Sequence, residues 1–240
     1  MKQQLIIIPG WGGNRKTWQN FIDLAKDDFE VFFMDMPCFG DLPCPDKVWG
    51  VEEYAFFIKK KVEDLNLHKP ILLGHSFGGQ VAANLAAANP DLFSRLVLSG
   101  AAILRPSYTL KRIIFKMIAT TGKMIFRLPI LRPVEKIAKR VLYKAADSPD
   151  YEETTGVKRE IFKKIIRQSQ AHLLPQIKIP SLVVWGSEDS YVSLSQGKII
   201  ATKIPNAVLE VVAGGKHGLH IQQPENLLSI ILKFVEKNKL

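Results

Sequence analysis

Short apolar runs alternate with longer amphipathic segments along this chain, and this alternation limits the folds that it can adopt. The runs are bounded by Gly, Pro or Asp and lack polar alternation, which is typical of strands buried on both faces of a parallel sheet. Strands are expected at residues 4–8, 31–34, 71–73, 96–99, 182–185 and 208–212, and helices at 17–26, 51–65, 79–88, 195–204 and 225–237. This order predicts an α/β fold in which a mostly parallel sheet of about six strands is flanked by helices.

The alternation is interrupted between residues 101 and 175, where only helical periodicity is found. Apolar side chains of this segment fall on one helical face, and basic side chains lie mainly off it. The segment holds 16 Lys and Arg against 6 Asp and Glu, which leaves 17 of each sign in the rest of the chain. The whole formal net charge of +10 therefore lies in this segment. We predict a core of residues 1–100 and 176–240 and a basic helical insertion of residues 101–175.

Composition and hydropathy indicate a globular chain outside the membrane. With 47% hydrophobic and 23% charged residues, no tract is polar enough to be disordered. The apolar run at residues 5–8 is too short for a secretory signal, and polar residues interrupt the uncharged stretch 71–90, unlike a membrane span. Cys38 and Cys44 form neither a disulfide framework nor a four-ligand zinc site. We expect them as free thiols in a reducing cytoplasm, with a local disulfide as the less favoured alternative.

A serine in a glycine-rich turn is the strongest chemical signal in the sequence. Gly-His-Ser-Phe-Gly-Gly at residues 74–79 directly follows the apolar strand 71–73 and precedes a helical pattern. A serine on such a sharp turn projects its hydroxyl above the sheet, and the helix N-terminus presents backbone N–H groups to a developing oxyanion. We therefore predict that Ser76 is a nucleophile, with an ordinary loop serine as the alternative.

A serine nucleophile needs a histidine base and a carboxylate that orients the base, and both are expected later in the chain. Asp189 follows the strand 182–185, and the neighbouring Glu188 is a rival for the same role. His217 follows the strand 208–212, and its rival is His220. Both loops are expected at the carboxyl ends of parallel strands, where the sites of open sheets assemble.

A second glycine-rich turn, Pro-Gly-Trp-Gly-Gly at residues 9–13, follows the first expected strand. We expect the backbone N–H of Trp11 in this turn and the backbone N–H of Phe77 to point together at the oxyanion. The alternative is that the turn is only a tight connection between a strand and a helix. It lacks both the G-x-G-x-x-G pattern of dinucleotide sites and the Lys-Ser/Thr ending of a phosphate-binding loop. No Cys and His spacing suggests a metal. The sequence therefore predicts no cofactor and no metal.

These motifs together resemble the α/β-hydrolase superfamily over nearly the whole chain. The matching segments are Pro-Gly-Trp-Gly-Gly at 9–13, Asp-Met-Pro-Cys-Phe-Gly at 35–40, Gly-His-Ser-Phe-Gly-Gly at 74–79, Gly-Ser-Glu-Asp at 186–189 and Gly-Lys-His at 215–217. The resemblance implies the α/β-hydrolase fold, a helical cap at residues 101–175, and a triad of Ser76, His217 and Asp189. The sheet would be truncated to six strands from the eight of the family core.

The resemblance also helps to choose between the rival residues. Family members commonly have a helix that starts with Pro-Glu seven residues after the catalytic histidine. In this chain Pro-Glu at 224–225 has this spacing from His217. Asp189, three residues after a glycine, matches the family's acid better than Glu188 does. Two departures remove no catalytic group: Pro9 stands where the family commonly has histidine, and Cys38 stands where a loop glycine is usual.

The chemistry implied is hydrolysis of a carboxylic ester with a medium or long apolar acyl group. The apolar cap residues expected to line the substrate pocket are Ile114, Met117, Ile118, Met124 and Ile125. The chain is similar to small cytosolic esterases of the pimeloyl-[acyl-carrier protein] methyl ester type, which implies a basic cap that docks an acidic acyl carrier.

Several alternatives stay open at this point. A lactonase, including one that hydrolyses acyl-homoserine lactones, and a carbon–carbon bond hydrolase acting on a dienoic acid would use the same triad. A non-enzymatic protein could bind an anionic membrane surface or an acidic protein through the basic segment. Nucleic acid is not an expected partner, because no recognised reader motif accompanies the charge.

Overall fold

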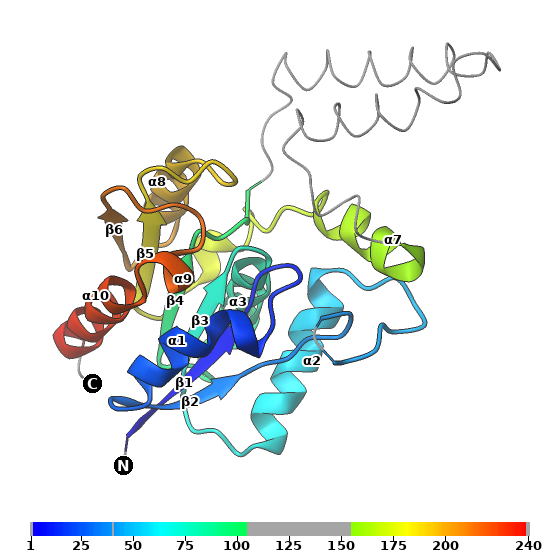
Figure 1. The fold of residues 1–240 in the computed structure, drawn as a ribbon, viewed down its shortest axis with the longest axis horizontal. Helices are drawn as coiled ribbons and strands as arrows, with labels where there is room; N and C mark the ends of the chain where they lie inside the picture. The colour runs from blue at the N-terminus through cyan, green and yellow to red at the C-terminus, as the bar shows by residue number, and fades with distance from the viewer. Residues whose placement is uncertain (1, 40, 105–154, 239–240) are drawn as a thin grey trace, which may run out of the picture.

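The computed structural model describes residues 2–39, 41–104 and 155–238, in which strands and helices alternate (Figure 1). The strands are β1 Gln3–Ile8, β2 Phe29–Phe33, β3 Ile71–His75, β4 Arg95–Ser99, β5 Ser181–Gly186 and β6 Ala207–Val212. All neighbouring strands pair in parallel, in the order β2-β1-β3-β4-β5-β6. The predicted parallel sheet of six strands is confirmed.

Helices cover both faces of the sheet. One face carries α1 Arg15–Ala25, α9 Leu219–Gln222 and α10 Pro224–Lys237, and the other carries α2 Val51–Asp64, α3 Phe77–Ala88 and α8 Leu194–Lys203. Successive strand residues point to opposite faces, so Ile71 and Leu73 of β3 enter the core under α1 and α10, whereas Leu72 enters the other. Burial on both faces explains why these strands are continuous apolar runs.

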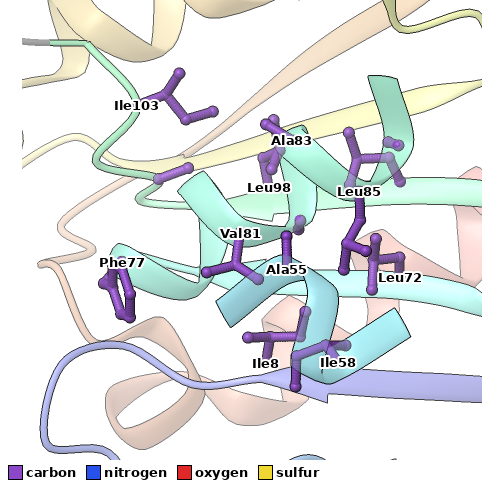
Figure 2. Close-up of a cluster of buried hydrophobic side chains, with 14 of the residues drawn as sticks. Ile8, Ala55, Ile58, Leu72, Phe77, Val81, Ala83, Leu85, Leu98 and Ile103 are labelled. Carbon is purple, nitrogen blue, oxygen red and sulfur yellow. The ribbon is translucent and has the colours of Figure 1, made fainter. Parts of the chain in front are cut away.

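The core between the sheet and the helices α2 and α3 fixes the position of α3. Figure 2 shows Ile8 and Leu72 from the strands, Ile58 from α2 and Val81 from α3 in one buried cluster. All four side chains are fully buried. Because α3 directly follows β3, this packing also holds the turn between them at the carboxyl end of the sheet.

Helix α7, Gly156–Ile165, lies within the predicted insertion and is held against the start of α2. The Val51 N–H donates to Gln168 Oε1 at 2.9 Å, and Lys164 Nζ lies 3.2 Å from Glu53 Oε1. A short 3-10 helix, η2 Leu174–Gln176, then leads to β5. Residues 105–154 lie outside the described residues, and with them the expected pocket residues Ile114, Met117, Ile118, Met124 and Ile125. The division into core and cap therefore stays a prediction.

The prediction of two free thiols is wrong, because Cys38 and Cys44 form a disulfide. The loop after β2 folds back on itself, so that the Cys38 N–H donates to the Pro43 carbonyl at 3.3 Å. This backbone bond brings the two cysteines together. The redox environment of a compartment does not determine such a local turn, and the turn is what places the two cysteines within bonding distance.

None of the helices in the described ranges is long and apolar enough to cross a membrane.

Candidate active site

Ser76 lies in a strained turn between β3 and α3. Its φ of 51° and ψ of −116° place it in the positive-φ region that residues other than glycine rarely adopt. Three backbone bonds hold it there: its N–H donates to the Ser99 carbonyl at 3.1 Å, and its carbonyl accepts from the N–H groups of Gly79 and Ala102, both at 3.0 Å. A strained residue that is held so firmly indicates a functional position.

The glycines on either side of Ser76 are required by close packing. A Cβ on Gly74 would lie 2.6 Å from the Cβ of Ala82, and a Cβ on Gly78 would collide with the carbonyl oxygens of Ile8 and Pro9. The strand β3, the helix α3 and the end of β1 can therefore approach one another only without side chains at these two positions. This contact explains the glycine spacing in the sequence motif.

Asp189 and His217 form a hydrogen-bonded pair at the carboxyl ends of β5 and β6. His217 Nδ1 lies 2.8 Å from Asp189 Oδ2. The second oxygen, Oδ1, accepts the N–H groups of Tyr191 at 2.9 Å and Val192 at 2.8 Å. The Asp189 side chain is 0% exposed and that of His217 is 17% exposed, whereas Glu188 is exposed. Because Nδ1 donates to the carboxylate, Nε2 of His217 is left as an acceptor for another proton donor.

The turn at residues 9–13 lies directly against Ser76. A Cβ on Gly10 would be 3.1 Å from the Cβ of Ser76, so the glycine allows this approach. The Trp11 ring packs edge-on against Phe39, with 4.8 Å between ring centroids, and in a tilted orientation against Phe162 of α7, at 4.9 Å. These aromatic contacts hold the Trp11 ring at the pocket that Ser76 also lines, and the oxyanion role of the Trp11 backbone N–H stays a prediction.

Ser76 and His217 line one pocket of about 590 Å³, and Trp11 and Phe77 line it too. The structure therefore brings four of the five predicted catalytic and oxyanion residues to one cavity and places Asp189 behind His217. Apolar walls come from α7 and the residues after it and from the loop after β5. They include Phe162, Ile165, Ile166 and Val192.

Comparison with known proteins identifies the family. The profile of the alpha/beta hydrolase family matches residues 5–230. The chain belongs to this family. The predicted α/β-hydrolase fold is thereby confirmed, while the narrower resemblance to pimeloyl-[acyl-carrier protein] methyl ester esterases stays a prediction.

Individual relatives of this α/β hydrolase span nearly its whole length. The uncharacterized hydrolase YugF of Bacillus subtilis (strain 168) is 28% identical over 252 residues, which cover 98% of this chain and 90% of the relative. The 2-hydroxy-6-oxononadienedioate/2-hydroxy-6-oxononatrienedioate hydrolase of Paraburkholderia phymatum is 25% identical over 259 residues, covering 98% and 87%. A solved structure, the alpha/beta hydrolase enzyme MGS-M2 from a Medee basin deep-sea metagenome library, has a TM-score of 0.75 at 20% identity, covering 100% of this chain and 91% of that one.

Two other histidines of the hydrolase lie close to His217 but in different environments. His220 is buried and stacks on Trp18 with ring centroids 3.8 Å apart. Burial, followed by the charge of His217, lowers the pKa of His220 to about 3. His75 is buried and donates from Nδ1 to the Ser99 carbonyl at 2.9 Å, and burial also lowers its pKa well below the usual range. Both rings are therefore neutral near pH 7 and poor bases.

No motif singles out Gly100, which directly follows β4 and lies beside the His–Asp pair of the hydrolase. Its φ is 53°, and a Cβ there would lie 3.1 Å from His217 Nδ1 and 3.3 Å from Asp189 Oδ2. Any side chain would press on both partners of the 2.8 Å hydrogen bond. The only signal in the sequence was a glycine directly after an apolar strand, which is also the signal of an ordinary turn.

Proposed function

We propose that this α/β hydrolase cleaves carboxylic esters through a triad of Ser76, His217 and Asp189 and an acyl-enzyme. The observation that carries the proposal is the pairing of His217 with the buried Asp189 at the rim of the pocket that Ser76 lines from its strained turn. The acid–base pair and the nucleophile come from three different loops at one edge of the sheet. A merely structural histidine would not need this arrangement.

The chemistry follows from the roles of the three side chains. Nε2 of His217 takes the proton of the Ser76 hydroxyl as its oxygen attacks the carbonyl carbon. The backbone N–H groups of Trp11 and Phe77 stabilise the negative oxygen of the tetrahedral intermediate. His217 then returns the proton to the departing alcohol, which leaves an acyl ester on Ser76. A water molecule, deprotonated by His217, attacks that ester and releases the carboxylic acid and the free serine. Asp189 holds the ring in the required tautomer and stabilises its positive charge.

A substrate panel tests the reaction class. We expect ethyl esters of medium and long acyl chains to be hydrolysed with higher kcat/KM than short ones, because the described pocket walls from α7 are apolar. The panel should also contain an acyl-homoserine lactone and an acyl-carrier methyl ester, with acid release followed at constant pH. Turnover of the lactone without turnover of any linear ester would contradict the proposal.

A second candidate, hydrolysis of a carbon–carbon bond in a dienoic acid, is favoured by two observations. One relative is named for a nonadienedioate, a substrate with two carboxylates. Lys216, directly before His217, is the only charged side chain among the described pocket residues, and a carboxylate would complement it. Adding a 2-hydroxy-6-oxo-dienoic acid to the panel separates the two reactions.

The basic segment at residues 101–175 is proposed to dock an acidic acyl carrier or an anionic membrane surface. Replacing Arg112, Lys116 and Lys123 by glutamate is expected to weaken binding to acyl carrier protein or anionic vesicles by about 100-fold or more, since each basic residue near an anionic surface contributes about 1 kcal/mol. Hydrolysis of a small neutral ester should be unaffected. Binding by co-sedimentation and turnover by acid release measure the two effects.

A matched control reverses the charge of three exposed lysines that lie outside this segment in the sequence. These are Lys198 and Lys203 of α8 and Lys237 of α10. The control variant changes the net charge equally but should bind normally. Equal loss of binding and turnover in the cap variant would show that its three residues serve the fold or the pocket instead.

A further inference from the structure

Gln80 is a buried polar residue in the wall of the catalytic pocket. It lies on α3 one helical turn after Ser76, lines the same pocket, and is only 2% exposed. Buried polar groups in proteins are almost always hydrogen-bonded. The side-chain amide of Gln80 therefore needs an acceptor for its NH₂ group and a donor for its carbonyl oxygen.

Within residues 2–39, 41–104 and 155–238, one end of the Gln80 amide has a hydrogen-bond partner and the other end has none. Nε2 donates to the Ala102 carbonyl at 2.6 Å, and Ala102 in turn donates its own N–H to the Ser76 carbonyl at 3.0 Å. Oε1 is buried and accepts no hydrogen bond from any of the residues that the structure describes. Turning the amide over would place Oε1 against the Ala102 carbonyl, where two acceptors repel, so the bond to Ala102 fixes which end is unpaired. The free end of Gln80 is an acceptor.

An unpaired buried acceptor favours a ligand that brings its own donor. Gln80 follows Ser76 by four residues at the start of α3, and both residues line the same pocket. Because the substrate carbonyl carbon must reach Ser76 in this pocket, the inference places the donor close to that carbon, on the first or second carbon of the acyl chain. A hydroxyl group on the acyl chain satisfies this requirement, and a saturated chain leaves Oε1 unpaired.

We propose that Gln80 accepts a hydrogen bond from a hydroxyl group on the acyl chain, and that the preferred substrates are esters of 2- or 3-hydroxy acids. This inference rests on the proposed ester hydrolysis and names its substrate class. Gln80 contacts the substrate but not the reacting atoms, and so determines specificity. A site with a buried polar group discriminates against analogues that lack the matching group, because they leave that group unpaired.

The test compares three esters of the same chain length: ethyl 3-hydroxyoctanoate, ethyl octanoate and ethyl 3-methoxyoctanoate. The methoxy ester keeps the oxygen but lacks the donor. We expect kcat/KM for the hydroxy ester to exceed that for the other two by about 5- to 100-fold. In Gln80→Met, whose side chain has similar length and no acceptor, this ratio should fall to about one. Because each ratio is measured within one protein sample, it does not depend on how much of the variant is folded.

Asn84 provides the matched control, since it lies one turn further along α3, is polar and does not line the pocket. Asn84→Leu should keep both the rate and the preference of the parent protein. A ratio near one in the parent protein, with ethyl octanoate still hydrolysed, would overturn the role of Gln80 and leave ester hydrolysis standing. The acyl-side assignment would fall if 2-hydroxyethyl octanoate were preferred instead. If no ester were hydrolysed, the proposed function would be wrong, and this inference with it.

Discussion

Ser76→Ala is expected to lower kcat/KM for a medium-chain ester by at least about 10⁴-fold, because the proposed acyl-enzyme forms on the Ser76 hydroxyl that alanine lacks. The variant should also lose covalent labelling by a fluorophosphonate. The fold should be retained, since the turn is held by backbone bonds from Ser99, Gly79 and Ala102 that alanine preserves. Steady-state hydrolysis and intact-mass analysis after labelling measure the two losses, and a thermal melt verifies folding.

Ser190 supplies the control for this substitution. It lines the same pocket but is exposed in the loop after β5, away from the strained turn. Ser190→Ala should keep both labelling and turnover. Labelling retained in Ser76→Ala and lost in Ser190→Ala would move the nucleophile to the other serine and refute the proposed mechanism.

The strands could be predicted from the sequence because a strand that is buried on both faces consists almost entirely of apolar residues. Ile71, Leu72 and Leu73 form an uninterrupted apolar run, and all three are fully buried between two layers of helices. Helix α3 begins at Phe77, two residues before the predicted start at Gly79, and it includes Gly78 although glycine is a poor helix former. Helix propensity was outweighed there by the need for close packing against β1 and β3.

Residues whose role depends on distant neighbours could not be found from local patterns. Gly100 matters because the chain brings Asp189 and His217 against it, and Gln80 matters because Ala102 pairs only one end of its amide. Neither contact is encoded in a short motif. The disulfide between Cys38 and Cys44 likewise depends on a loop conformation and not on composition.

The choice between His217 and His220 rested in the sequence on register, and the structure adds a physical reason. Only His217 is bonded to a carboxylate, that of Asp189. His220 lies flat on Trp18 with a pKa of about 3, so it is a weak base at neutral pH.

His217→Ala is therefore expected to lower kcat/KM by at least about 10⁴-fold, because both steps of the reaction need its proton transfers. His220→Phe keeps an aromatic ring on Trp18 but has no titratable nitrogen, and should cost less than about tenfold. The measurement is kcat/KM for a neutral ester between pH 5 and 8. In the parent protein and in His220→Phe, the rate should depend on pH in the same way, since burial keeps His220 neutral over this whole range.

The pH profile of His220→Phe distinguishes a base from a packing residue. Because burial keeps His220 neutral above about pH 4, removing its nitrogens cannot shift the acid limb of the profile. A loss of stability from altered stacking on Trp18 would lower the melting temperature without moving that limb. A near-inactive His220→Phe together with an active His217→Ala would reverse the assignment, and Asp189 would then be left orienting a histidine with no part in the reaction.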